Sequence, residues 1–238
     1  MNCRLYCHPL AQPWALTLAS GASIELALRP PDAPRPYLWA APEQIELHSA
    51  DPRLSGVWVA ASELQRRAAD GSMLKRACGA LGDATVLDPM AGWGVDALLL
   101  AATGARVVAF EREPSLHLLS RDLARRSGIT GVEFVCGDGR RALAAAKPFD
   151  LVYLDPMFSF NAKTALPGKR MQVTRALPNT MTELTAQDLL GWIEAARASA
   201  RRRVVLKRRL KDPAVGSPHW QIKGRSVRYD VYRGTVRP

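Results

Sequence analysis

The sequence predicts an α/β protein built on a doubly wound, mostly parallel sheet. From residue 84 onward, short apolar segments alternate with segments of helical periodicity, which is the pattern of consecutive strand–helix units. Most of these apolar segments end in an acid or a glycine turn, as expected where parallel strands meet a ligand site. The last two apolar segments, 221–224 and 227–232, alternate like an antiparallel hairpin.

The 238 residues provide one large domain and a small extension. We assign the proline-rich residues 1–60 to a small N-terminal extension with β elements at about 15–28 and 45–47. Residues 61–238 form the main domain, which begins with a helix at about 62–81.

The main domain contains five predicted parallel strands and their connecting helices. Each strand is a short apolar run, and Pro114 marks the start of one helix because proline fits the first helical turn. The region 159–182 shows no clear period, so we expect a long loop there. The expected strands are 84–88, 106–111, 132–135, 149–154 and 203–206, and the expected helices are 95–102, 114–126, a short one ending near 146, and 184–200.

The charge of the chain indicates a polyanionic partner. Thirty-three Lys and Arg oppose 22 Asp and Glu, which gives a net charge of +11 and a pI near 10. From Arg197 onward there are thirteen Lys and Arg but only two acids, Asp212 and Asp230. A basic excess that persists over the whole C-terminal segment favours nucleic acid as the partner, with an anionic membrane second.

Cysteine content and hydropathy indicate the cellular compartment and argue against metal and membrane binding. The four cysteines show no disulfide spacing and no Cys-x-x-Cys pair, which favours a reduced, cytoplasmic compartment. Cys3, Cys7 and His8 lack a fourth ligand at a suitable spacing, so we expect no metal site. The stretch 14–22 is too short and too polar to span a bilayer, so we expect no membrane partner.

Acidic side chains follow four of the five predicted parallel strands. The carboxyl ends of such strands meet at one edge of the sheet, where ligands bind. A single acid at a strand end is usually a helix cap, but four in consecutive strands predict a shared ligand site. These acids are Asp88, Glu111, Asp138 and Asp155.

A glycine turn follows the first of these strands. Gly92 and Gly94 allow the backbone to approach a ligand closely, and the next helix offers free N–H groups. A dinucleotide would use the same features, but its fingerprint requires a third glycine that 95–97 does not supply. Glu111 is placed to accept hydrogen bonds from both hydroxyls of a ribose, and Asp138 to accept one from an adenine amino group.

The tetrapeptide Asp155-Pro156-Met157-Phe158 follows the fourth strand. The carboxylate of Asp155 and the carbonyl of Pro156 are able to accept both N–H bonds of an exocyclic amine on a nucleic-acid base, while Phe158 stacks on the extruded base. Such an amine is a weak nucleophile because its lone pair is delocalised, so orientation is the main help that a protein can give it. A tight turn with a buried Phe is the alternative interpretation.

These motifs resemble the amino-directed branch of the class I methyltransferases, and more closely the RsmJ-type 16S ribosomal RNA guanine-N2 methyltransferases. The resemblance covers roughly residues 40–238 and is specific over 84–170. It is carried by 42–47, 86–97, 110–114, 152–158, 163–166, 204–208 and 223–235. It implies S-adenosyl-L-methionine as the cofactor and the N2 amine of a guanine near the 3′ end of 16S RNA as the methyl acceptor. It also implies that the partner is 16S ribosomal RNA or the small ribosomal subunit.

Together with the strand-end pattern, the resemblance implies which residues form the site. Three positions differ from the family's pattern, since Val95 stands where the family has an arginine, and Asp138 and Gly139 stand where it has serines. The expected catalytic residues are Asp155, Pro156 and Phe158. The expected cofactor contacts are Asp88, Gly92, Gly94, Val95, Asp96, Glu111, Arg112, Asp138, Gly139 and Asp155.

Basic residues after the tetrapeptide and near the C-terminus are the candidates for RNA contact. A long basic loop beside a catalytic turn suits an RNA-gripping lid, and Lys and Arg side chains bind phosphates. The candidates are Lys163, Lys169, Arg170, Lys207 and Arg208.

Three other functions use part of this pattern. A DNA amino-methyltransferase shares the chemistry but usually carries a target-recognition domain, for which 238 residues leave little room. A nicotinamide-dependent oxidoreductase shares the glycine turn and Glu111 but has no use for residues 155–158. A non-catalytic basic RNA-binding or ribosome-assembly protein explains the charge but not the four acids. The sequence leaves the oligomeric state open.

Overall fold

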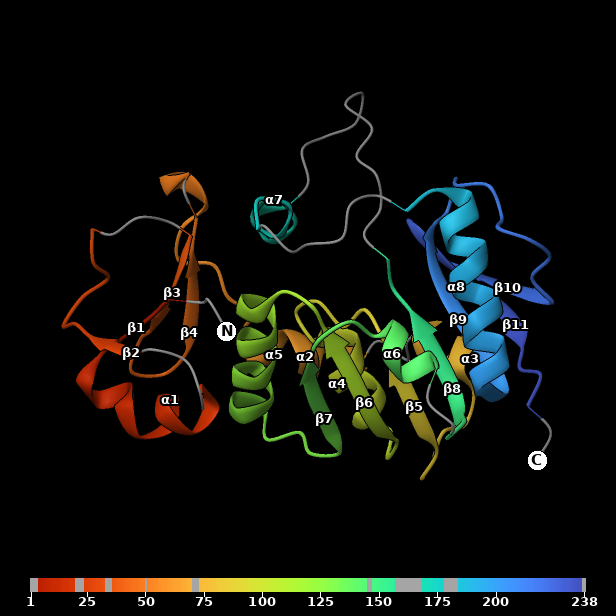
Figure 1. Cartoon of the computed structure of the whole chain (residues 1–238), viewed down its shortest axis with the longest axis horizontal. Helices are drawn as coiled ribbons and strands as arrows, with labels where there is room; N and C mark the ends of the chain where they lie inside the picture. Colours follow the sequence, from red (N-terminus) through yellow and green to blue (C-terminus); the bar gives the residue numbers. More distant parts are fainter. Residues whose placement is uncertain are drawn as a thin grey trace.

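The structure, a computed structural model, contains a small N-terminal sheet at one end of the long axis and a larger sheet at the other (Figure 1). Within the described residues, no helix is long and apolar enough to cross a membrane. The same residues hold no group of three or more His, Cys, Asp or Glu side chains arranged to bind a metal ion. The described residues are 4–19, 24–32, 36–49, 51–69, 73–144, 147–156, 168–177 and 184–236.

The larger sheet confirms the predicted doubly wound architecture. Its strands are β5 (Thr85–Asp88), β6 (Arg106–Glu111), β7 (Val132–Cys136), β8 (Phe149–Leu154), β9 (Ala200–Arg209), β10 (Trp220–Lys223) and β11 (Val227–Arg233). They lie in the order β10-β11-β9-β8-β5-β6-β7. The five strands from β9 to β7 run parallel, and β10 and β11 form the predicted antiparallel hairpin at one edge.

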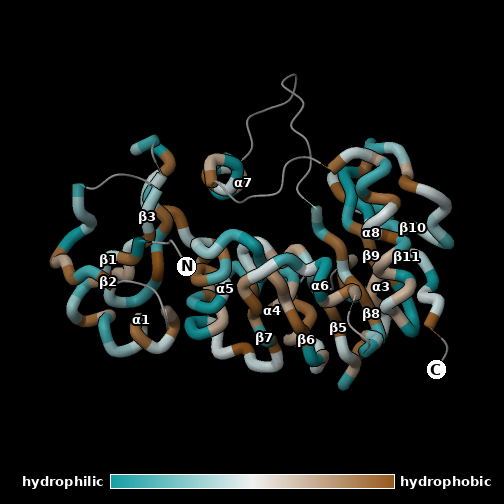
Figure 2. Tube along the Cα trace, viewed as in Figure 1, coloured by the Kyte–Doolittle hydropathy of each residue, from teal (hydrophilic) through white to brown (hydrophobic). Residues whose placement is uncertain are grey.

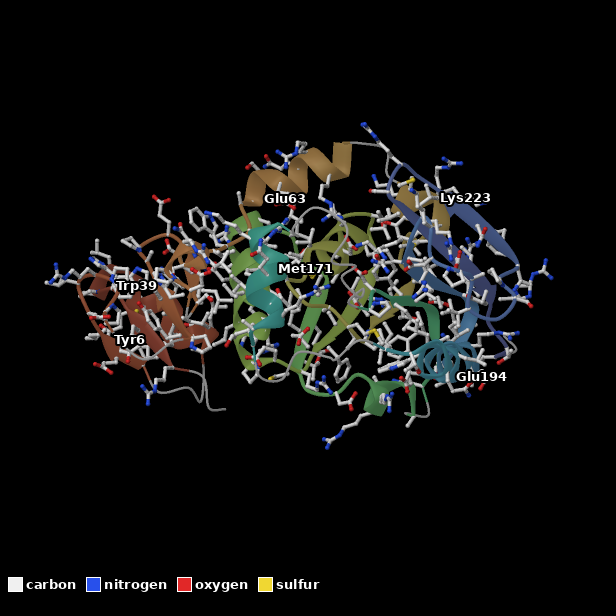
Figure 3. The ribbon with its side chains drawn as sticks, turned by 90° about the horizontal axis from the view of Figure 1, so that it is seen from above. Tyr6, Trp39, Glu63, Met171, Glu194 and Lys223 are labelled. Atoms are coloured by element: carbon white, nitrogen blue, oxygen red, sulfur yellow. The ribbon has the colours of Figure 1, made fainter. Side chains whose placement is uncertain are left out.

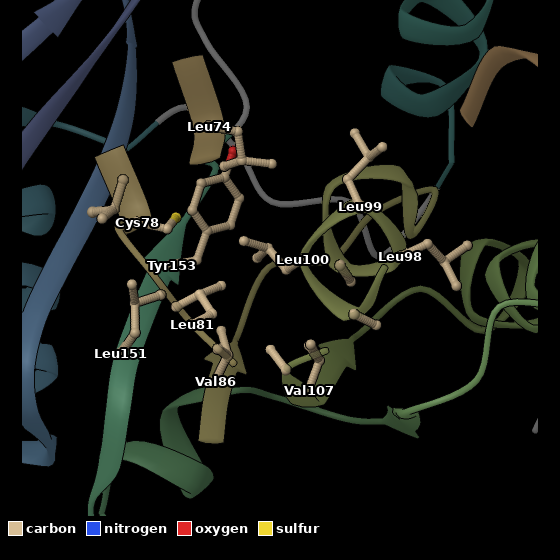
Figure 4. Packing of buried hydrophobic residues seen from close by; sticks show 14 of the residues in the cluster. Leu74, Cys78, Leu81, Val86, Leu98, Leu99, Leu100, Val107, Leu151 and Tyr153 are labelled. Carbon is tan, nitrogen blue, oxygen red and sulfur yellow. The ribbon is translucent and has the colours of Figure 1, made fainter. Parts of the chain in front are cut away.

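Helices cover both faces of this sheet. They are α2 (Ala61–Ala69), α3 (Met73–Cys78), α4 (Val95–Ala101), α5 (Pro114–Ser127), α6 (Arg140–Leu143) and α8 (Ala186–Ser199). A further helix, α7 (Lys169–Arg175), lies beyond the carboxyl ends of the strands (Figure 1). On one face, Leu74 of α3 and Leu100 of α4 pack with Val86 and Tyr153 of the sheet (Figure 4). On the other face, α6 and α8 form a second apolar cluster with β8 and β9. Figure 2 shows that hydrophobic residues concentrate in the central strands.

The order of the strands creates a switch point between β5 and β8. From β5 the chain proceeds outward through β6 and β7, and it then returns to the other side of β5 as β8. Ligands of open α/β sheets bind in the crevice at such a point, beyond the carboxyl ends of the strands. Asp88 at the end of β5 and Asp155 after β8 flank this position.

The N-terminal sheet has the order β2-β1-β3-β4. It consists of β1 (Leu5–Cys7), β2 (Ile24–Leu26), β3 (Tyr37–Ala40) and β4 (Ile45–His48), with α1 (Gln12–Leu18) and the 3-10 turns η1 (Pro9–Ala11) and η2 (Pro52–Leu54). The strand predicted at 45–47 is confirmed. The β element predicted at 15–28 is wrong over its first part, which belongs to α1. Pro13 stands in the first turn of this helix, and Trp14, Ala15 and Leu18 bring one apolar face onto the sheet.

Helix α5 contacts both sheets. Leu116 and Leu119 of this helix pack in one cluster with Leu38 and Ile45 of the N-terminal sheet. On the same helix, the buried carboxylate of Asp122 accepts a hydrogen bond from the Ile45 backbone N–H at 3.0 Å. The N-terminal sheet is therefore fixed against the main domain by apolar packing and by a buried polar contact.

Three further elements differ from their sequence predictions. The helix expected at 62–81 is two helices, α2 and α3, within the described residues. The expected loop at 159–182 contains α7, which tertiary contacts described below hold in place. The last parallel strand, predicted at 203–206, is longer in the structure, where β9 spans Ala200–Arg209. It pairs with β8 on one side and with β11 on the other, and this pairing keeps its basic residues in the extended conformation as well.

Candidate active site

A cavity of about 780 Å³ lies at the carboxyl edge of the parallel strands. Its volume falls within the roughly 300–1,000 Å³ of small-molecule sites. Besides the strand ends, α2, α7 and the segment 55–60 contribute to its wall. The sequence-predicted residues that line it are Asp88, Gly92, Val95, Asp96, Glu111, Arg112, Asp155, Pro156, Lys169, Arg170 and Lys207.

The glycine turn is tied to the end of β6 through Glu111. Oε2 of Glu111 accepts a hydrogen bond from the Gly92 N–H at 2.8 Å, and Oε1 accepts one from the Glu113 N–H at 2.7 Å. A carboxylate has about four lone-pair sites, so Glu111 retains the capacity to accept from a ligand hydroxyl. Burial raises the pKa of Glu111 above its usual value. Gly92 has a φ of 54° with open space beside its Cα, which leaves room for a ligand to approach the backbone.

Two residues give the turn its shape. Gly94 adopts a φ of 75° directly before α4, and a Cβ there would lie 2.6 Å from Cβ of Ser120, so only glycine fits. Asp88 is buried and accepts a hydrogen bond from the Met90 N–H at 3.1 Å. Burial raises the pKa of Asp88 well above its usual value, and the nearby carboxylate of Asp155 raises it further.

A cluster of charged side chains forms the part of the cavity between α2, α4, β8 and β9. Nζ of Lys207 lies 2.7 Å from Oδ2 of Asp96 and 2.7 Å from Oδ2 of Asp155. Arg67 pairs with the other oxygen of Asp96 at 2.7 Å, and the Tyr153 hydroxyl donates to Asp96 at 2.7 Å. Two cations therefore neutralise two carboxylates in a largely buried position.

The pKa values of this cluster follow from burial and pairing. Burial opposes the charge of Asp96, but Lys207 and Arg67 outweigh it and lower the pKa of that carboxyl below its usual value. Burial likewise opposes the charge of Lys207, but Asp155 and Asp96 raise its pKa, so the ammonium stays charged. For Asp155, burial exceeds the attraction of Lys207 and raises the pKa to about 6. Asp155 is consequently the member of the cluster that titrates near neutrality.

Helix α7 lies above the carboxyl ends of the strands (Figure 1) and over the main sheet when viewed from above, where Met171 is labelled (Figure 3). The Trp93 indole N–H of the glycine turn donates to Oγ1 of Thr174 at 2.8 Å. At the other side, Arg170 pairs with Glu63 of α2 at 2.8 Å. These contacts place Lys169 and Arg170 in the cavity wall, on the same side of the sheet as Asp155.

Comparison with known proteins assigns this geometry to a family. Residues 23–234 match the family model described as "Putative SAM-dependent methyltransferase". The ribosomal RNA small subunit methyltransferase J of Alkalilimnicola ehrlichii is 33% identical over 240 residues, covering 92% of this chain and 90% of that protein. The protein of the same name from Magnetococcus marinus is 35% identical over 226 residues, covering 82% and 83%. This chain belongs to the ribosomal RNA small subunit methyltransferase J family.

The structural comparison agrees with this membership. The crystal structure of a SAM-dependent methyltransferase from Neisseria gonorrhoeae superimposes with a TM-score of 0.72 at 25% identity, covering 97% of this chain and 96% of that one. The protein is thus a class I methyltransferase that uses S-adenosyl-L-methionine. The predicted family, fold class and cofactor are confirmed. The acid-lined cavity fits this cofactor, because a sulfonium cation is attracted by carboxylates and Glu111 retains lone pairs for the ribose.

Some residues predicted for the methyltransferase site do not line the cavity. Oδ1 of Asp138 accepts a hydrogen bond from the N–H of Arg140, the first residue of α6, at 3.0 Å, so this carboxylate is held beside the start of that helix. Gly139 packs so closely on Pro89 that a Cβ would collide with it, so this glycine supports the cavity wall from behind. Gly94 is not in the cavity lining either, and its close neighbour is Ser120. Phe158 and Lys163 lie outside the described residues.

The two basic residues predicted on β9 are not free surface cations. Lys207 lies inside the cavity between two carboxylates, so a phosphate contact would compete with two ion pairs. Only 12% of the Arg208 side chain is exposed, and it pairs with Asp212 at 3.5 Å. Leu206 of β9 pairs with Leu154 of β8, so Lys207 lies beside Asp155 at the carboxyl edge of the sheet. This position near the end of a parallel strand is the sequence signal that could have placed Lys207 in the site.

Several cavity residues were not predicted from the sequence. Arg67 and Glu63 come from α2, which sequence periodicity alone does not direct toward the cavity. Trp58 lines the cavity with 42% of its surface exposed, and among the described residues it is the one large aromatic side chain that is exposed. Trp58 lies in a segment without regular secondary structure, so the sequence shows no hydrophobic periodicity there from which its orientation could be predicted.

Proposed function

We propose that this methyltransferase transfers the methyl group of S-adenosyl-L-methionine to the exocyclic N2 amine of a guanine near the 3′ end of 16S ribosomal RNA. The observation that carries the proposal is the position of Asp155 and Pro156 in the same cavity as Glu111 and the glycine turn. The names of its relatives as small subunit ribosomal RNA methyltransferases support the substrate. The net charge of +11 suits a polyanionic substrate.

The glycine turn and the end of β6 would hold the cofactor. Bound S-adenosyl-L-methionine supplies an activated methyl group. Both oxygens of Glu111 are fixed by backbone N–H groups, so the carboxylate is already oriented to accept from the ribose hydroxyls. Val95 would contribute through its backbone, and Asp96 and Arg112 would complete the wall around the amino-acid and sugar portions. Asp138 remains a predicted contact for the adenine amino group.

Asp155 and Pro156 would hold the target amine. Lys207 pairs with Oδ2 of Asp155 and thereby holds that oxygen in place. We assign the amine contact to Oδ1 of Asp155 and to the Pro156 carbonyl, which together accept its two N–H bonds and direct the nitrogen lone pair toward the methyl group. Such pre-orientation is worth up to roughly 7–11 kcal/mol in well-aligned reactions. Phe158, which lies outside the described residues, is the predicted stacking partner of the extruded guanine.

The proposed substrate also implies in which compartment the protein acts and which partner it binds. Ribosomal RNA methylation places it in the cytoplasm, with free 16S RNA or the small ribosomal subunit as its partner. Lys169 and Arg170 in the cavity wall are proposed phosphate contacts, as is Lys163 outside the described residues. We retain a domain boundary near residue 60, because the four-stranded sheet ends at His48 while α2 packs on α4 and α5 of the main domain.

Two measurements test the proposed function. Calorimetric titration should show binding of S-adenosyl-L-methionine and S-adenosylhomocysteine but not of NAD, which separates the proposal from an oxidoreductase. Incubation with unmodified 16S RNA or small subunits, followed by mass spectrometry of nucleosides, should yield N2-methylguanosine. Methylation of duplex DNA in place of RNA, or cofactor binding without any transfer, would contradict the proposal.

A further inference from the structure

The turn of the C-terminal hairpin lies at the same edge of the sheet as the cavity. Lys207 of β9 pairs with Tyr229 of β11, and Tyr229 pairs with Ile222 of β10. Because β10 runs toward this edge, Lys223 ends the strand there and the turn 224–226 extends beyond it. Two strand spacings separate Lys207 from Ile222, which is roughly 10 Å. The turn is therefore a neighbour of the catalytic cluster in space.

Helix α3 packs directly against this turn. A Cβ on Gly224 would collide with the side chain of Met73 at the start of α3. The helix also contacts β10 and β11 through further residues. From above, the labelled Lys223 lies on the hairpin next to this helix (Figure 3). The turn and the start of α3 therefore form neighbouring parts of the surface at this edge of the sheet.

This surface, which we name the basic face, consists of Lys75, Arg76, Lys223 and Arg225. All four side chains are exposed. The segments that carry them, 73–78 and 220–226, contain no Asp or Glu. The basic face therefore adds a local positive field at the rim of the site.

We propose that the basic face binds the phosphate backbone of the RNA strand next to the base that enters the cavity. This inference rests on the proposed function. Lys and Arg bind phosphates without reading sequence, and they fix the register of the nucleic acid relative to the reactive site. At about 3.4 Å per stacked nucleotide, the roughly 10 Å between Lys207 and the hairpin corresponds to about three nucleotides. The basic face would hold a backbone segment this far from the target guanine.

The opposite edge of the sheet provides a matched control. Arg106 begins β6 and Arg202 lies near the start of β9, so both stand at the amino ends of parallel strands. Both side chains are exposed. Replacing Arg106 and Arg202 with Gln removes the same charge as replacing Lys223 and Arg225 with Gln, but on the side of the sheet away from the cavity.

The experiment compares these two double variants on an in-vitro transcribed, unmodified 3′ fragment of 16S RNA. RNA affinity is measured between 50 and 200 mM KCl, with methyl transfer and S-adenosylhomocysteine affinity measured alongside. For Lys223→Gln/Arg225→Gln we expect the slope of log K against log salt to shrink by about 1.4–1.8, at roughly 0.7–0.9 for each of the two lost phosphate contacts. KM for RNA should rise, while kcat at saturating RNA and cofactor affinity stay at the parental values. The Arg106→Gln/Arg202→Gln control should keep the parental slope.

The outcomes separate this inference from the proposed function. If the parent protein methylates the RNA with a steep salt dependence but both double variants share its slope, the basic face is not the phosphate site. An equal loss of slope in both variants would also overturn the inference, because it would show a diffuse charge effect. If only assembled subunits, and not the RNA fragment, respond to the hairpin variant, the face does not bind the backbone next to the target guanine and the inference is wrong. Failure of the parent to methylate any RNA would instead contradict the proposed function.

Discussion

The ammonium of Lys207 lies 2.7 Å from Oδ2 of Asp155, inside the cavity rather than on the outer basic surface. The same ammonium pairs with Asp96, which Arg67 holds from the other side. Since Asp155 is the group that we assign to the target amine, Lys207 acts on catalysis through the position and ionisation of that carboxylate. The lysine is thus a positioning residue in our account.

Removal of Lys207 should change the pH profile of the reaction. Burial raises the pKa of Asp155 to about 6 even though Lys207 lowers it. If the ionised carboxylate holds the amine, kcat/KM, which reports the free enzyme, should fall as the pH drops through about 6. In Lys207→Met the lowering influence is lost, so the acid limb should move to higher pH. The groups that continue to act on Asp155 are the neighbouring carboxylates, chiefly Asp96.

The conservative variant supplies the control for this profile. Lys207→Arg retains the positive charge, so its acid limb should stay close to the parental position even if kcat falls through altered geometry. Rates are compared at saturating cofactor, and thermal unfolding checks that each variant is folded. Identical acid limbs for the parent and folded Lys207→Met would show that Lys207 does not act through Asp155.

Glu111→Ala should weaken cofactor binding. The substitution removes the acceptor that we assign to the ribose and also releases the Gly92 N–H. Charged hydrogen bonds of this kind contribute roughly 1–3 kcal/mol, and isothermal titration with S-adenosylhomocysteine measures the loss. Glu133→Ala removes an exposed carboxylate on β7 and should bind like the parent. Parental affinity in folded Glu111→Ala would remove the ribose assignment.

A methyl group at Gly139 should destabilise the fold around the cavity. A Cβ at this position collides with Pro89, whose backbone belongs to the glycine turn, whereas a Cβ at Gly137 meets nothing within 4 Å. Overpacking of this kind costs about 1–3 kcal/mol. Denaturant unfolding should therefore show a lower free energy of unfolding for Gly139→Ala but not for Gly137→Ala. Equal stability of the two variants would mean that the Pro89 contact is not a constraint.

Lys169 tests the proposed RNA contact in the cavity wall. Its replacement by Gln should lower the slope of log K against log salt by roughly 0.7–0.9, the value for one phosphate contact. Lys147 is exposed ahead of β8, at the amino end of that strand, so Lys147→Gln serves as the control and should keep the parental slope. Filter binding with 16S RNA at several salt concentrations provides the data. An unchanged slope in Lys169→Gln would place this lysine outside the RNA interface.

Local sequence pattern was sufficient for the parallel sheet and for the edge that carries the site. The strands β6 and β8 match their predicted bounds because each is an apolar run closed by an acid or by an acid and proline. Gly92 and Glu111 were placed together because their strands are neighbours in a parallel sheet. Such inferences need only strand order and direction, both of which follow from alternation of strands and helices.

Contacts between side chains that are far apart in the sequence could not be predicted from the sequence pattern. Lys207 looked like one basic residue among many, and its role depends on two carboxylates more than 50 positions away in the chain. Helix α7 has a weak local signal and is fixed by Trp93 and Glu63, again through long-range contacts. The strands β1 and β3 are too short to show a period, so their pairing also depends on tertiary packing.

The most direct test of the account is the single-turnover rate of methyl transfer by Asp155→Ala, with unmodified 16S RNA and labelled S-adenosyl-L-methionine. Because the carboxylate is assigned to the amine in the transition state, we expect the rate to fall by roughly 100-fold or more. Cofactor affinity should stay near the parental value, and Asp155→Asn, which retains one acceptor oxygen, should keep partial activity. A folded Asp155→Ala protein that forms N2-methylguanosine at the parental rate would contradict the assignment of the active site.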